Sequence, residues 1–155
     1  MKPKLPIVFI VMTVVIDAMG IGLIIPVMPQ LLLEVLPTAT LGQAAIWGGV
    51  MAMLFSLMQF LFGPMLGSLS DQYGRKPLLL VTLVMMTIGY LIMALAGGIW
   101  LLLFGRIIGG ISSATQSTAT AYIADISKPE EKAGNFGLIS AGFGIGFVLG
   151  PLLGG

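Results

Sequence analysis

The stretch G-S-L-S-D-Q-Y-G-R-K, from Gly67 to Lys76, separates two long apolar segments and sets the pattern for the whole chain. The residues on either side of it are apolar for long enough to cross a bilayer, which takes about 20 residues of helix. Gly74 permits a tight turn, and the basic pair Arg75 and Lys76 favours the cytoplasmic side of a membrane. The stretch therefore predicts a short cytoplasmic turn between two membrane-spanning helices.

Apolar blocks separated by short polar turns recur along all 155 residues. Hydrophobic residues make up 57% of the chain and charged residues 8%, which is too little charge to cover a surface exposed to water. Unbroken apolar runs favour spanning helices over barrel strands, which would alternate in segments of about ten residues. We therefore predict an all-α transmembrane protein with helices at about 6–33, 43–70, 77–97, 99–124 and 135–155.

Basic residues mark one set of alternate helix ends, namely Lys2, Lys4, Arg75, Lys76, Lys128 and Lys132. The connections after the first and third predicted helices carry no basic residue. The positive-inside rule then places the N-terminus in the cytoplasm. Asp17 interrupts the first apolar run and no convincing cleavage site follows, so we expect a retained helix rather than a signal peptide.

The composition excludes several classes of function. A net charge of +1 without a basic cluster argues against nucleic acid as a partner. The chain has no cysteine and no histidine, so the usual zinc sites and Ser-His catalysis are absent, and any proton must be carried by a carboxylate. We find no nucleophile–base pair and no cluster of metal ligands. We therefore expect neither an enzyme nor a metal site, and a lipid bilayer as the surroundings.

Two ionisable residues, Asp17 and Arg106, lie deep within predicted spans, where a charge costs at least about 2.5–3.5 kcal/mol. Asp17 is ~16 Å from the cytoplasmic start of the first helix, and Arg106 is ~12 Å from the outer end of the fourth. These depths nearly coincide in a core about 30 Å thick. The two side chains are candidates for handling substrate or protons in one polar cavity, with a purely structural ion pair as the alternative.

Small and polar residues within the spans suggest further contacts. Gly142, Gly146, Gly150 and Gly154 recur every four residues, so they form a groove that another helix can approach closely. Gln59 in the second helix and Gln116 in the fourth are candidates for lining a substrate site, although such groups also bond neighbouring helices. Pro26 and Pro29 interrupt the outer half of the first helix, which fits either a kinked packing helix or one that lines the site.

Three motifs resemble those of the major facilitator superfamily. The stretch around Gly67, Asp71, Gly74, Arg75 and Lys76 is similar to the signature loop of that family, which implies a cytoplasmic gate that closes against the second half of the transporter. Gln72 stands where a basic residue is common. Arg106-Ile-Ile-Gly-Gly resembles the intramembrane arginine motif linked to proton coupling. The spacing of Gly137, Gly146, Gly150, Pro151, Gly154 and Gly155 resembles the motif of drug/proton antiporters, and implies that these residues shape an interface with the second half.

The drug/proton antiporter group that confers tetracycline resistance resembles the chain most closely. The shared segments are Asp17-Ala-Met-Gly-Ile-Gly22 with Pro26 and Pro29, Gln59-Phe60, and Tyr122-Ile-Ala-Asp-Ile126. Gly89 departs from that pattern, because these antiporters typically carry an aspartate in the third helix before a tyrosine. Glycine can neither titrate nor bind a cation, so the carboxylate set is incomplete here.

The resemblance implies the first five helices of a twelve-helix major facilitator fold, with residues 1–155 forming an incomplete N-terminal transporter half. It implies proton-coupled export of tetracycline or other small drugs by alternating access, across the inner membrane of a bacterium. The proton gradient would supply the energy without a cofactor, and the substrate includes drug–divalent cation complexes. The missing C-terminal half would be the partner. The alternatives are an exporter of a sugar or metabolite and a small non-transporting membrane protein that acts by helix association.

Overall fold

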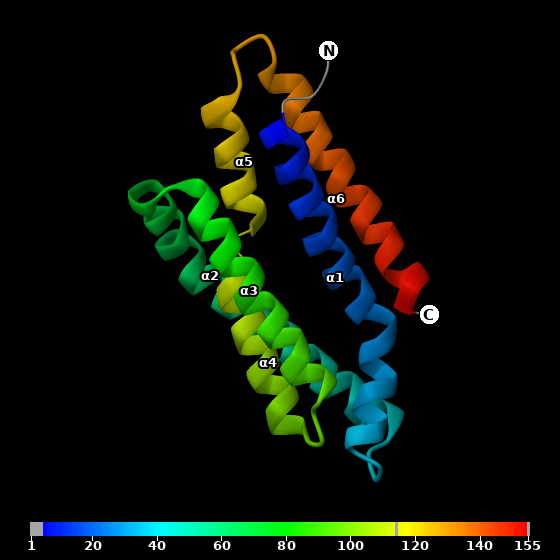
Figure 1. Ribbon diagram of the computed structural model, residues 1–155. Helices are drawn as coiled ribbons and strands as arrows, with labels where there is room; N and C mark the ends of the chain where they lie inside the picture. Colours follow the sequence, from blue (N-terminus) through cyan, green and yellow to red (C-terminus); the bar gives the residue numbers. More distant parts are fainter. Residues whose placement is uncertain (1–4, 114, 155) are drawn as a thin grey trace.

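The computed structural model describes residues 5–113 and 115–154, and this part of the chain consists of helices without strands. The helices are α1 (Leu5–Val35), α2 (Leu41–Tyr73), α3 (Arg75–Ala94), α4 (Ile99–Ser112), α5 (Thr115–Ile126) and α6 (Lys132–Gly154), shown in Figure 1. Lys2, Lys4 and Gly155, named above for the orientation and the antiporter motif, lie outside the described residues. The connections α1–α2 and α3–α4 lie at one end of the bundle, and the α5–α6 connection lies at the other (Figure 1).

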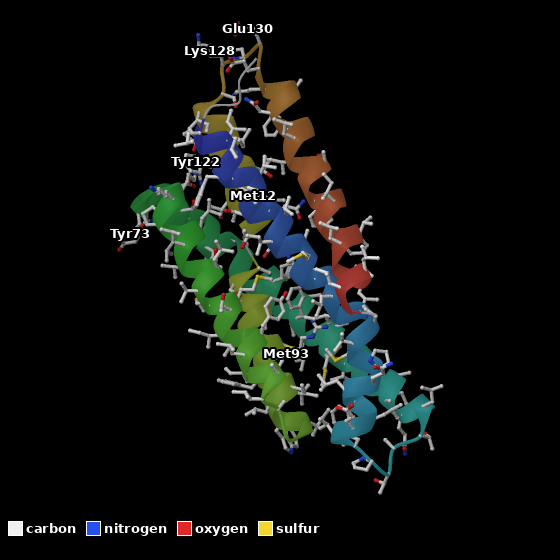
Figure 2. The ribbon with its side chains drawn as sticks, turned by 45° about the vertical axis from the view of Figure 1, so that its right-hand side comes forward. Met12, Tyr73, Met93, Tyr122, Lys128 and Glu130 are labelled. Carbon is white, nitrogen blue, oxygen red and sulfur yellow. The ribbon has the colours of Figure 1, made fainter. Side chains whose placement is uncertain are left out.

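The predicted all-α transmembrane architecture is confirmed. Five segments within the described residues are long and apolar enough to cross a membrane: Leu5–Val35, Leu41–Tyr73, Arg75–Ala94, Ile99–Ile126 and Lys132–Gly154. Large apolar side chains cover the outer faces of these helices, with Phe60 and Trp100 each 77% exposed. Charged side chains gather instead at the connections, as Lys128 and Glu130 do at the tip between α5 and α6 (Figure 2). Such a surface is stable in lipid and unstable in water.

A single residue, Gly74, connects α2 to α3. Its φ of 96° lies in the region that only glycine enters readily, and its amide donates to the carbonyl of Ser70 at 3.1 Å. The predicted polar turn is therefore shorter than its sequence suggests, since α2 continues to Tyr73 and α3 starts at Arg75. Pro77 fits the first turn of α3 because an amide there has no partner within the helix.

The fourth predicted span is interrupted, which the sequence reading did not foresee. α4 ends at Ser112, Ser113 forms a turn, and α5 begins at Thr115 in the same direction (Figure 1). The hydroxyl of Ser112 donates to the Ile108 carbonyl at 3.0 Å, and that of Ser113 donates to the Gly110 carbonyl at 2.7 Å. Serine hydroxyls that bond back to helix carbonyls bend a helix, and here they follow a pair of glycines.

Two apolar clusters hold the helices together. One joins α1, α3, α5 and α6 through Ile7, Ile10, Val14, Leu79, Ala119, Ile123 and Ile139. The other joins α1, α2, α3 and α4 through Met28, Leu32, Ala44, Met51, Met93, Leu102 and Leu103. Along α1, residues 15–27 separate the two clusters, and this interval contains Asp17. Several buried polar residues of the described chain, among them Thr82, Thr115 and Thr118, lie near it in the bundle.

Candidate functional site

A buried polar layer crosses the bundle between the two apolar clusters. It includes Asp17 from α1, Thr82 from α3, and Thr115 and Thr118 from α5, each at most 5% exposed. Ser112 and Ser113, at the junction of α4 and α5, are also buried. Polar groups in the middle of a membrane protein are costly unless they bond one another or face a wet cavity. This buried polar layer is therefore a candidate functional site.

Asp17 is 5% exposed and its Oδ1 has no hydrogen-bond partner among the described residues. The Thr115 hydroxyl lies within hydrogen-bonding reach of the Asp17 carboxyl and 3.5 Å from the Thr82 hydroxyl. A hydroxyl has a single proton to donate, so Thr115 donates to one of these groups at a time. The carboxyl of Asp17 is thus buried and only partly satisfied by hydrogen bonds, and its part in handling protons stays a prediction.

Arg106 lies on α4 and faces a cavity of about 160 Å³ between α1, α2, α3 and α4. Its guanidinium carbon is 5.5 Å from the centre of the Phe55 ring, a cation–π geometry. Its Nε is buried and has no hydrogen-bond partner within the described chain. Arg106 therefore brings a positive charge with unused hydrogen-bonding capacity into an otherwise apolar cavity.

The structure does not bring Asp17 and Arg106 into direct contact. Arg106 lines the cavity and Asp17 does not, and each retains an unpaired polar atom where an ion pair would have satisfied both. Tyr90 of α3 interacts electrostatically with both residues, and its hydroxyl packs against Gly20 of α1. The two charges are thus linked through Tyr90, a residue to which the sequence analysis gave no role. The sequence held one indication of this role, because Tyr90 directly follows Gly89, the position at which the resemblance predicts a charged residue.

Gly89 lies at a close contact between α3 and α4. A methyl group on it would lie 3.3 Å from the Gly105 carbonyl oxygen, and one on Gly105 would lie 3.0 Å from the Gly89 carbonyl oxygen. Both glycines line the cavity with Arg106. The carboxylate expected here by resemblance is absent, and the pair of glycines instead lets the two helix backbones meet.

The two glutamines proposed as lining residues do not face this cavity. Gln59 on α2 and Gln116 on α5 are both exposed. Ser56, one turn before Gln59, does line the cavity and is also exposed. Both amides point away from the described bundle. They could line a substrate site only together with residues outside this bundle.

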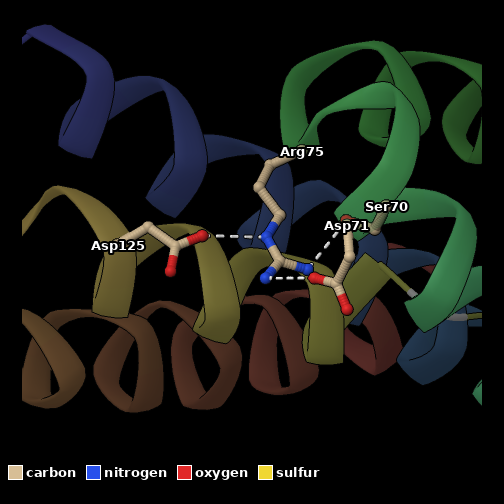
Figure 3. A network of polar contacts seen from close by, with 4 residues as sticks. All are labelled: Ser70, Asp71, Arg75 and Asp125. Atoms are coloured by element: carbon tan, nitrogen blue, oxygen red, sulfur yellow. Dashed lines mark hydrogen bonds and ion pairs between the residues drawn. The ribbon is translucent and has the colours of Figure 1, made fainter.

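A second polar cluster lies at the α2–α3 turn (Figure 3). Arg75 Nε donates to Oδ2 of Asp125 at 2.9 Å, and its two terminal nitrogens engage Asp71 and the Ser70 hydroxyl, the latter at 3.1 Å. The guanidinium is shielded at 20% exposure, whereas the two carboxylates are more than half exposed. Asp125 is fifty residues from Arg75 in sequence, so this contact fixes the end of α5 to the turn.

The contacts of the signature loop within this chain are only partly those expected, and its action as a gate stays a prediction. Arg75 and Asp71 act within this part of the chain, and Asp125 is a partner that the sequence analysis did not assign to the gate. Lys76 is exposed. No described atom lies within 4 Å of a methyl group placed on Gly67, so the close helix contact expected there is not made by these helices.

The glycines of the antiporter motif pack mainly against α1. Methyl groups on Gly146 and Gly150 would collide with backbone atoms of α1, including the carbonyl oxygens of Val15 and Met19. Gly154 lies against Leu23, and Pro151 against Gly22. The predicted groove and its close helix contact are confirmed, and the helix that lies in it is α1 of this chain. An interface of the motif with a second half stays a prediction. Gly137 is the exception, because a methyl group placed on it would meet no described atom of another helix within 4 Å.

Five candidate spans within the described residues, a buried polar layer and a cavity lined by Arg106 define a polytopic helical membrane protein. The family model of the Major Facilitator Superfamily matches residues 10–155. The chain belongs to this superfamily, which confirms the resemblance carried by the three motifs.

The chain is similar to tetracycline resistance proteins along its length. It is 48% identical over 155 residues to the class C protein of Escherichia coli, covering 100% of this chain and 38% of that protein. It is 42% identical over 149 residues to the class H protein of Pasteurella multocida, covering 96% and 36%. It is 38% identical over 111 residues to major facilitator superfamily domain-containing protein 10 of Bos taurus, covering 72% and 24%. The chain thus spans well under half the length of these relatives.

Proposed function

We propose that the chain forms the N-terminal part of a proton-coupled antiporter that exports tetracycline or other small drugs. The proposal rests chiefly on the similarity to tetracycline resistance proteins, which extends over the whole chain at 48% identity in one case. The buried carboxyl of Asp17 and the cation of Arg106, joined through Tyr90, supply a proton acceptor and a coupled charge in the middle of the membrane. An exporter of a sugar or metabolite, or a non-transporting protein, has no comparable support.

The mechanism we propose is alternating access, in which a site between two transporter halves opens first to one side of the membrane and then to the other. Asp17 takes the proton, because the chain has no histidine or cysteine to do so. The cluster of Arg75, Asp71 and Asp125 holds the α2–α3 turn while the inward side is closed. The proton gradient supplies the energy without a resident cofactor.

We place this antiporter in the inner membrane of a bacterium, as a multi-pass protein with its N-terminus in the cytoplasm. Long apolar helices suit that membrane, and the basic residues Arg75, Lys76, Lys128 and Lys132 lie at alternate helix ends. A drug–divalent cation complex is a second form of cargo. Gly89 offers it no carboxylate in the cavity, so we give the metal-free drug preference.

Drug susceptibility of a pump-deficient bacterium tests the proposal. The complete transporter is expressed as wild type and as Asp17→Asn, and growth is measured against tetracycline, unrelated cationic and neutral drugs, and toxic sugar analogues. Resistance to at least one drug that is lost in Asp17→Asn supports the proposal. Unchanged susceptibility to every drug, or resistance confined to sugar analogues, contradicts it.

A further inference from the structure

We propose that the Arg106 cavity is a subsite for an aromatic ring that carries an ionised oxygen, such as a carboxylate or phenolate. The proposal rests on the proposed export function and narrows it, because it assigns to the substrate an acidic aromatic group. Three properties of the cavity support it: its charge, its size and its lining.

The charge of the cavity is positive. Among the described residues that line it, Arg106 is the only one with a formal charge, and its Nε has no protein partner. Asp17 is not a lining residue, and its Oδ1 has no hydrogen-bond partner among the described residues. A guanidinium is planar and binds carboxylate-like groups through parallel hydrogen bonds. An anionic oxygen therefore satisfies Arg106, whereas a cationic group would be repelled from it.

The size and lining of the cavity suit one ring. Its volume of about 160 Å³ is close to that of an apolar cavity, about 150 Å³, known to hold benzene. Phe55 and Tyr90 supply aromatic surfaces, and Met86 and Met93 supply thioethers that pack well against rings. Neutral polar groups are few, with Ser56 as the lining hydroxyl on α2. The pattern of an apolar pocket with one strong polar anchor is typical of ligand sites.

Because residue 89 is glycine, α3 places no carboxylate beside the Arg106 guanidinium in this cavity. An aspartate at this position would add a carboxylate on α3 to a cavity that Gly89 and Arg106 both line. It would compete with any anionic ligand for the guanidinium. The added Cβ would lie 3.3 Å from the Gly105 carbonyl and 3.4 Å from Ile108 Cγ2, a tight fit that requires a shift of a few tenths of an ångström. Asparagine imposes the same crowding without the charge, so the two substitutions isolate electrostatics.

Equilibrium binding of three ring-sized probes to the purified complete transporter tests the proposal. The probes are salicylate (anion), benzyl alcohol (neutral) and benzylamine (cation), and the variants are Arg106→Gln, Gly89→Asp and Gly89→Asn. We expect saturable salicylate binding that is weakened about tenfold or more by Arg106→Gln and by Gly89→Asp. Gly89→Asn should bind salicylate more tightly than Gly89→Asp. Benzylamine should bind weakly to the wild type and no more weakly to either charge-altering variant.

The proposal is overturned if salicylate binds equally to the wild type and Arg106→Gln, if wild type prefers benzylamine, or if the aspartate and asparagine variants bind salicylate alike. The pair at position 89 keeps the test decisive should Arg106→Gln fail to fold. Drug export, measured with the same wild-type and variant transporters, distinguishes failure of the proposed subsite from failure of the proposed export function. Export without Arg106-dependent salicylate binding refutes the subsite alone, and absence of any drug export refutes the proposed function.

Discussion

Close packing between α1 and α6 makes a quantitative prediction about Gly150. A methyl group there would lie 2.5 Å from the Met19 carbonyl oxygen, 2.6 Å from the Leu23 amide nitrogen and 2.7 Å from the Gly22 carbonyl carbon. All three are backbone atoms, so no side-chain rotation relieves the collision. Normal contact distances of about 3.5 Å require the helices to separate locally by about 1 Å. A gap of 0.5–1 Å forfeits roughly a quarter to a half of the attraction of each atom pair across it.

We expect Gly150→Ala to destabilise the transporter by about 1–3 kcal/mol, the usual cost of overpacking. The apparent Tm should fall by on the order of 2–10 °C. Thermal unfolding of the detergent-solubilised complete transporter, followed by size-exclusion chromatography of heated samples, measures this change.

Gly144→Ala is the matched control on the same helix. No described atom lies within 4 Å of a methyl group at Gly144, and alanine is a better helix former than glycine by about 1 kcal/mol. This variant should keep or raise the Tm. If Gly150→Ala is as stable as the wild type, the close α1–α6 contact is wrong.

Four further substitutions test other parts of the structure. Asp125→Asn removes the carboxylate charge bonded to Arg75, and because that carboxylate is 55% exposed, we expect a stability loss of at most about 1 kcal/mol that shrinks in high salt; a larger, salt-independent change in Tm would contradict this. Phe55→Leu removes the ring facing the Arg106 guanidinium and should weaken salicylate binding several-fold while leaving the Tm within a few degrees; equal binding would show that the ring is not used. Thr38→Cys, in the α1–α2 connection, and Lys128→Cys, in the α5–α6 connection, should react with a membrane-impermeant thiol reagent from opposite sides of the membrane in a cysteine-free background; labelling from the same side would overturn the predicted topology.

Apolar patterning was sufficient to predict the spans and the turn at Gly74, because helices in lipid must satisfy their backbone internally and their length follows from the bilayer. Patterning could not show the break at Ser113, since serine is common within membrane helices and the bend depends on local bonds to Ile108 and Gly110. The five apolar segments are similar in composition, so the sequence did not indicate which helices pack against each other.

Most of the differences at the site follow from that missing order. The groove of Gly146 and Gly150 was evident from a spacing of four, but its partner α1 was not. Asp125 appeared to be an ordinary loop charge, and only the packing of α5 beside α3 brings it to Arg75. Matching depths placed Asp17 and Arg106 at one level, yet the two side chains do not pair in the described structure, because depth does not specify which way each helix faces.

Proton movement in everted membrane vesicles tests the central claim most directly. Vesicles containing the complete transporter are energised to an acidic interior, tetracycline or the most effective drug from the susceptibility panel is added, and a pH-sensitive dye reports the gradient. We predict that drug addition dissipates the gradient in wild-type vesicles and not in Asp17→Asn vesicles. Glu34→Gln is the control, since Glu34 is an exposed acidic residue on the same helix, and it should behave as wild type. Drug-dependent dissipation that persists in Asp17→Asn would contradict the account, because the buried carboxyl would then not carry the proton.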